Sequence, residues 1–94
     1  MTKPVGKLNG TVIKVAAGTS SAASAAIADN VLFVRVVADQ NAYIEFGSAP
    51  TASSSTHYIP ANQVEYFKVQ TDGTKVAALR AGSTSGNVWI SEVV

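Results

Sequence analysis

A chain of 94 residues with a formal net charge of +1 is long enough for one domain with one core and too short for an interdomain cleft. The absence of cysteine excludes disulfides, zinc–thiolate sites and thiol nucleophiles. Charged residues are 14% of the chain, against about 25% in an average domain, so Ser, Thr, Ala and Asn must form much of the surface. Such a surface is either covered by neighbouring subunits or exposed on a particle or a secreted protein. Both alternatives argue against a free cytosolic enzyme.

The sequence carries no signal for a membrane or for secretion. No apolar run approaches the ~20 residues that cross a bilayer, and residues 1–10 lack the apolar region of a signal peptide. We therefore expect synthesis in the cytoplasm without secretory export. The nearest thing to a basic cluster, formed by Lys3, Lys7 and Lys14, indicates a solubilising arm rather than the dense stripe of a nucleic-acid-binding protein.

The first third of the chain predicts little regular structure. Residues 1–10, with one proline and two glycines, are expected to form an N-terminal arm, and the β-branched run 11–15 predicts the first strand. Residues 16–30 are ambiguous, because Ala favours helix while Ile27 is the one large apolar side chain available to anchor a helix face. We expect a weak strand near residues 21–27 with turns on both sides.

The strongest strand signal is "VLFVRVVAD", residues 31–39. Both of its faces are mostly apolar, so this strand is expected at the centre of a sandwich or under a partner subunit. The turn at 39–41 and the run at 42–46 predict an antiparallel hairpin with it. After a Ser/Thr-rich loop, residues 57–59 predict a short strand, which Pro60 ends or places at a sheet edge because proline cannot donate to a ladder.

The last third predicts three further strands, at 63–69, 75–81 and 88–94. The turn at 71–74 contains Asp-Gly, which readily supplies the positive φ of a hairpin turn, so the first two of these strands are expected to pair. Residues 82–87 form a longer connection before the closing strand.

About seven short strands spaced by roughly 8 to 12 residues predict an all-β fold. We expect a small antiparallel β-sandwich or jelly-roll-like barrel, in which residues 11–94 form a single domain behind an extended N-terminal arm. The expected core consists of apolar residues on the inward faces of these strands: Val12, Leu32, Val34, Val36, Ile44, Phe46, Ile59, Phe67, Leu79, Val88 and Ile90.

His57 is the one histidine and therefore the candidate general base. The nearby Ser53, Ser54 and Ser55 are too close in sequence to build a nucleophile–base pair without a special turn, and no G-x-S-x-G elbow is present. We interpret His57 as a hydrogen-bonding residue at a sheet edge, and we expect no enzymatic activity and no catalytic residues. The acids that could orient a catalytic histidine are Asp29, Asp39, Glu45, Glu65, Asp72 and Glu92.

Other kinds of site have little support. The pair Glu45 and Glu65 would suit glycosidase chemistry, but a chain of this size offers no deep cleft to shift the pKa of either carboxyl. One histidine without cysteine leaves no recognisable metal ligand set, and the glycines occupy turn contexts rather than a phosphate loop, so we expect no metal and no cofactor. The aromatic residues could form a stacking platform for a sugar or a base, or they could lie in the core or at a subunit interface. For the tryptophan we favour the core or an interface. The residues concerned are Trp89, Tyr43, Tyr58 and Tyr66.

Residues 31–94 present a distinctive order of motifs. A hydrophobic "VRVV" strand and a turn precede an aromatic-I-x-F-G strand, a Pro-Thr-Ala-Ser-rich loop and an "IPA" turn, which leads into "EYF", then "KVAALRAG" and "VWISEV". This order resembles that of small β-sandwich virion proteins of tailed bacteriophages. The resemblance covers about two thirds of the chain and rests on structural residues, without a catalytic motif, and the N-terminal third matches only loosely.

The resemblance implies a capsid decoration (cement) protein, or alternatively a head–tail, tail accessory or head-fibre subunit. It implies a place on the exterior of the virion capsid, self-association as a homotrimer, and binding to the major capsid protein through the arm and the loops at 47–56 and 82–87. Nucleic acid and membrane are not expected partners. A glycan-binding surface module for host attachment, using Trp89 and the tyrosines, remains an alternative of a different class.

Overall fold

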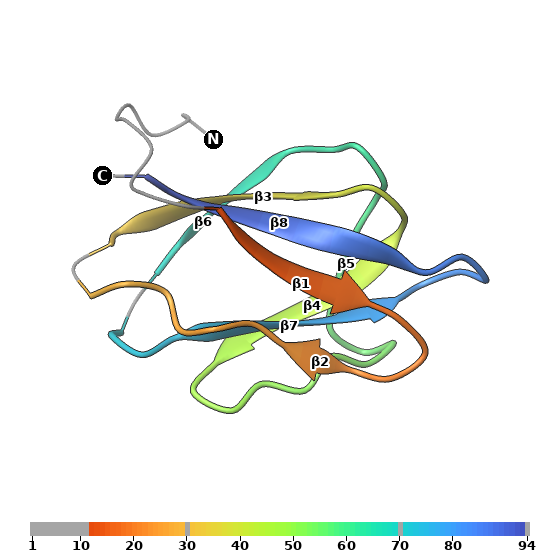
Figure 1. Cartoon of the computed structure of the whole chain (residues 1–94), viewed down its shortest axis with the longest axis horizontal. Helices are drawn as coiled ribbons and strands as arrows, with labels where there is room; N and C mark the ends of the chain where they lie inside the picture. Colours follow the sequence, from red (N-terminus) through yellow and green to blue (C-terminus); the bar gives the residue numbers. More distant parts are fainter. Residues whose placement is uncertain (1–11, 30, 70, 94) are drawn as a thin grey trace.

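The chain forms two four-stranded antiparallel sheets that pack as two layers (Figure 1). This computed structural model describes residues 12–29, 31–69 and 71–93. We call the sheet with strand order β1-β8-β3-β6 sheet A, and the sheet with order β2-β7-β4-β5 sheet B. The strands of the described residues are β1 (Ile13–Ala17), β2 (Ala22–Ala23), β3 (Phe33–Ala38), β4 (Ala42–Gly47), β5 (His57–Ile59), β6 (Glu65–Lys68), β7 (Lys75–Arg80) and β8 (Gly86–Val93).

This architecture confirms the predicted all-β sandwich. Each predicted strand overlaps a strand of the structure, and the radius of gyration of 12.2 Å matches the value of about 12 Å expected for a compact chain of this length. Within the described part of the chain, no helix is long and apolar enough to span a bilayer. The predicted arm at residues 1–10 lies outside the described residues.

The strand pairing contradicts both predicted hairpins. β3 and β4 lie in different sheets, and so do β6 and β7, although Gly73 between them adopts the predicted positive φ of 81°. Among the described strands, only β4 and β5 are both consecutive in sequence and neighbours in a sheet. Every other connection crosses from one layer to the other, so each sheet is assembled from segments that are distant in sequence (Figure 1).

The turn after β3 crosses the sandwich because distant segments bind its polar groups. The N–H of Asp39 donates to the carbonyl of Asn87 at 3.1 Å, and Oδ1 of Asp39 accepts the N–H of Asn87 at 2.7 Å. Asn41 accepts the N–H of Ala61 on its side-chain oxygen at 2.8 Å and the N–H of Ala81 on its carbonyl at 2.9 Å. β3 pairs with β8 along one edge and with β6 along the other. No edge of β3 remains for β4, which pairs in sheet B.

Most of the predicted core is buried, with two errors at strand starts. Val12 and Leu32 are 43% and 60% exposed, because each lies one residue before its strand begins. Leu79 is half-buried, since Val76 and Ala78 fill the inward positions of β7. Phe46 and Phe67 pack against the core from its margin. The predicted residues that are buried are Val34, Val36, Ile44, Ile59, Val88 and Ile90.

Small side chains contribute more to the core than the sequence suggested. Ala17, Ala38, Ala42 and Ala78 are each at most 1% exposed and belong to the same cluster as the large residues. Alanine carries little pattern information because it occurs on both faces of strands and in turns. Its burial here follows from strand position, which only the full pairing fixes. Further buried residues that the prediction omitted are Val15, Ile27, Val31, Val69 and Val76.

Sheet B ends in two short edge strands, β2 and β5. Pro60 directly follows β5, as predicted for an edge strand. The weak strand expected at 21–27 is confirmed only at Ala22–Ala23. Beyond it the side chain of Ser24 continues the pairing, because its Oγ accepts the N–H of Val76 at 2.9 Å while its own N–H donates to the carbonyl of Val76 at 2.8 Å.

Candidate functional site

Two open sheet edges meet at His57 and Glu65. His57 begins β5 at the edge of sheet B, and Glu65 begins β6 at the edge of sheet A. Nε2 of His57 lies 2.9 Å from Oε1 of Glu65, and the two side chains are 50% and 31% exposed. The ring of Phe67 meets the imidazole edge-on, with 5.4 Å between the ring centroids. His57 therefore joins the two layers at their margin.

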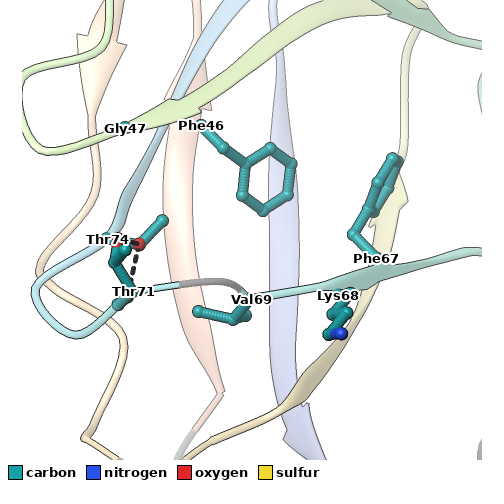
Figure 2. A pocket seen from close by; sticks show the side chains of 7 residues that line it. All are labelled: Phe46, Gly47, Phe67, Lys68, Val69, Thr71 and Thr74. Atoms are coloured by element: carbon teal, nitrogen blue, oxygen red, sulfur yellow. Dashed lines mark hydrogen bonds between the residues drawn. The ribbon is translucent and has the colours of Figure 1, made fainter.

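An open hollow of about 490 Å³ shares the Phe67 wall of this contact (Figure 2). The rings of Phe46 and Phe67 lie 5.1 Å apart, centroid to centroid, and border it together. At the other end, the hydroxyl of Thr74 donates to the carbonyl of Thr71 at 2.7 Å, so these polar groups bind each other. The walls suit an apolar group better than a polar substrate. The lining residues are Phe46, Gly47, Phe67, Lys68, Val69, Thr71 and Thr74.

The serines before His57 are held in a turn of their own. Oγ of Ser53 accepts the N–H of Ser55 at 3.2 Å. The hydroxyl of Thr56 donates to the carbonyl of Ser53 at 2.8 Å and accepts the N–H of Ser53 at 3.2 Å. The contact described for the imidazole is to Glu65 instead. The arrangement thus has a base and an acid at hydrogen-bond distance, but the hydroxyls of Ser53 and Thr56 bind the backbone of their own loop.

The structure separates the carboxylate pair Glu45 and Glu65. Glu45 points outward from sheet B, because Ala42 and Ile44 fill the inward positions of β4. Its Oε1 accepts the N–H of Phe46 at 2.9 Å. Glu65 turns instead toward His57 between the layers. The two carboxylates therefore do not share a cleft of the kind glycoside hydrolysis needs.

The remaining acids are placed away from His57. Oε2 of Glu92, a buried residue of β8, accepts the N–H of Ala28 at 2.8 Å. Asp39 binds the N–H of Asn87, and Asp29 and Asp72 are exposed in turns. Within the described residues, no three His, Asp or Glu side chains are grouped closely enough to hold a metal ion.

The four aromatic residues considered for a stacking platform divide between two faces. Tyr43 and Tyr58 are cross-strand partners on the outer face of sheet B, with ring centroids 5.8 Å apart. Trp89 and Tyr66 lie on the outer face of sheet A, because Val88 and Ile90 are the inward residues of β8 and Phe67 that of β6. Trp89 is half-buried on this outer face and is not a residue of the core cluster.

Sequence reasoning included Glu65 among six acids that could orient His57, but it did not single Glu65 out as the partner. The signal was the position of these two residues at the starts of two neighbouring short strands, but a pair across the layers requires knowing that β5 and β6 belong to different sheets. Comparison of the chain with family models, with curated proteins and with solved structures found no match.

Proposed function

We propose that this chain is a non-enzymatic structural protein of a tailed-phage particle. In this proposal it is a capsid decoration (cement) protein on the capsid exterior, which self-associates as a trimer and braces the major capsid subunits. The order of motifs in residues 31–94, which resembles that of small virion proteins, supports it. The two-layer β architecture is compatible with that resemblance.

The observation that carries the proposal is a set of exposed large apolar side chains on a chain with few charges. Leu32 is 60% exposed, Tyr58 44%, Val12 43% and Val64 39%, while charged residues are 14% of the chain. These residues lie in or beside strands of both sheets, so more than one side of the domain offers apolar contacts. Exposed apolar side chains on several sides, on a chain with few charges, support contact with other proteins, as expected for a subunit among copies of itself and a shell.

The stoichiometry of purified particles tests this proposal. We expect the chain to co-purify with particles at a copy number near that of the major shell protein, measured by quantitative mass spectrometry. A few copies per particle would favour a neck, tail accessory or head-fibre subunit. Absence from purified particles would contradict the proposal as a whole. Analytical ultracentrifugation tests self-association separately, and a monomer at all concentrations would contradict the trimer.

The paired rings of Tyr43 and Tyr58 favour one alternative, a glycan-binding surface module for host attachment. They lie side by side on an outer face, and Tyr58 is 44% exposed, as sugar stacking would require. A glycan array with the wild type and with Tyr58→Ala distinguishes the two functions. Binding that Tyr58→Ala abolishes would support the glycan module, whereas an array without binding would count against it.

A further inference from the structure

The strand registers place a compact set of side chains on the outer face of sheet A. One row across the sheet runs Lys14, Trp89 and Val37. The next row runs Ser91, Arg35 and Tyr66, and a third runs Val93, Phe33 and Lys68. The inward positions of the same strands hold the core valines and isoleucines, which fixes the direction of these nine side chains.

This face carries positive charge alone. Lys14 lies on β1, Arg35 on β3 and Lys68 on β6, and the described strands of sheet A direct no carboxylate to the same side. Glu65 and Glu92 both turn inward, to His57 and to the N–H of Ala28. Asp39, which follows β3, has its Oδ1 bound to the N–H of Asn87.

The outer face of sheet B has a different composition and provides an internal reference. Its charged side chains are Glu45 on β4 and Lys75 on β7, which are of opposite sign. They lie on neighbouring strands, with Lys75 opposite Gly47 in the register. The positive face is therefore a property of sheet A, in a chain whose net charge is only +1.

We propose that the outer face of sheet A is the docking surface of this chain for an acidic protein surface. The inference rests on the proposed function for the identity of the partner, namely the shell protein, while the chemistry of the face rests on the registers. Arg35 sits in the middle row beside Tyr66, and Trp89 lies one row away. Trp, Tyr and Arg are the side chains that dominate the binding energy of protein interfaces.

The distribution of charge favours a protein over single-stranded nucleic acid. Lys14 and Lys68 are exposed and lie on the two edge strands of the sheet, β1 and β6. Val37 shares the face with the aromatic rings and offers no surface for base stacking, and Val93 on the same side is buried. Aromatic side chains surround Arg35 at the centre of this face and the two lysines lie at its rim, which matches the aromatic and arginine-rich core and the polar rim of protein interfaces. A nucleic-acid site needs a continuous basic track along the backbone.

A charge-reversal pair with a matched control tests the face directly. The double variant Lys14→Glu/Lys68→Glu reverses two exposed charges on sheet A, and Lys75→Glu reverses one charge on sheet B, as either single lysine variant does on sheet A. The probe is poly-L-glutamate, titrated at low ionic strength and followed by backbone amide chemical shifts in NMR spectra. We expect shifts concentrated in β3 and β8, an affinity lowered about tenfold or more by the double variant, and a change within about twofold in Lys75→Glu.

Shifts on sheet B, or equal affinities of the double variant and Lys75→Glu, would overturn the inference. An oligothymidylate of about 12 nucleotides that bound more tightly than poly-L-glutamate and quenched Trp89 fluorescence would also overturn it, in favour of nucleic acid. Thermal unfolding of each variant confirms that it remains folded.

Binding to particles stripped of the chain separates this inference from the proposed function. Loss of binding in the double variant, with Lys75→Glu unchanged, supports both. If all variants bind equally, the particle role stands and the docking face is wrong. If the wild type does not bind particles but binds poly-L-glutamate on sheet A, the proposed function fails, while the preference of this basic face for acidic partners stands.

Discussion

Nε2 of His57 and Oε1 of Glu65, 2.9 Å apart, connect the edge strand of one sheet to the edge strand of the other. The residues are eight positions apart in sequence, yet the segment between them passes from sheet B to sheet A. Phe67 supports the imidazole from the side. The contact thus joins the two layers at a margin where their edge strands are not paired with each other.

A double-mutant cycle at this contact should show a small coupling energy. We expect His57→Ala, Glu65→Gln and the double variant to reveal a coupling below about 1 kcal/mol, because the side chains are partly exposed and water competes for them. Urea unfolding of the four proteins measures it, with Glu45→Gln as the control for loss of a surface carboxylate. A coupling above about 2 kcal/mol would mean that the pair behaves as a buried interaction.

Gly86→Ala should destabilise the fold. A Cβ at position 86 would collide with the carboxylate of Asp39 and approach the Gln40 side chain at 2.8 Å, and Asp39 cannot move without losing its bond to the N–H of Asn87. We expect a loss of about 1–3 kcal/mol. Gly82→Ala is the matched control, since nothing lies within 4 Å of a Cβ there. Equal melting temperatures for the two variants would contradict the close approach at Gly86.

Ser24→Ala should weaken the margin of sheet B. The Oγ of Ser24 accepts the N–H of Val76, which is fully buried, and donates to the carbonyl of Ala25. Its removal leaves a buried donor without that partner, at a cost of about 1–3 kcal/mol. Chemical denaturation gives the energy, and faster hydrogen exchange at the Val76 amide locates it. Ser48→Ala, at an exposed position, is expected to be neutral; an equal loss in both variants would exclude a specific role for Ser24.

Ile44→Ala and Leu32→Ala should differ sharply although both lie in strongly apolar runs. Ile44 is 1% exposed and central in the core, whereas Leu32 is 60% exposed. Truncation of Ile44 is expected to cost about 2–5 kcal/mol through lost burial and a residual cavity. Truncation of Leu32 should cost below about 1 kcal/mol, as measured by the same urea titration. A comparable loss at Leu32 would show that this side chain is buried in solution, as it would be in an oligomer.

The sequence predicted strand positions well because β-branched runs such as 31–39 are bounded by residues that occur mainly in turns. It predicted pairing poorly because the signals are local. The Asp-Gly turn before β7 has the positive φ of a hairpin and yet crosses the sandwich, since the same local geometry serves both connections. Whether a turn forms a hairpin or crosses to the other sheet depends on distant partners. At the turn after β3, for example, the N–H of Asn87 binds Asp39.

The same limit applies to the functional surfaces. Alternation in 31–39 places Arg35 on the opposite face of the strand from Val34 and Val36. The outward residues of this one strand of sheet A can therefore be predicted from the sequence alone. The neighbours of Arg35 are Ser91 on one side and Tyr66 on the other, and neither follows from local pattern. The basic face therefore appears only when β8 is known to lie between β1 and β3.

The central place of β8 in sheet A has a consequence for how the protein is made. β1 and β3 have no contact along the sheet except through Gly86–Val93, so sheet A cannot assemble on the ribosome until that segment has been synthesised and has left the exit tunnel. Until then β1 has no partner within sheet A and β3 has only β6, a state prone to association with other chains. Completion of sheet A therefore waits for its last strand and depends on contacts between residues far apart in sequence, which are slow to form.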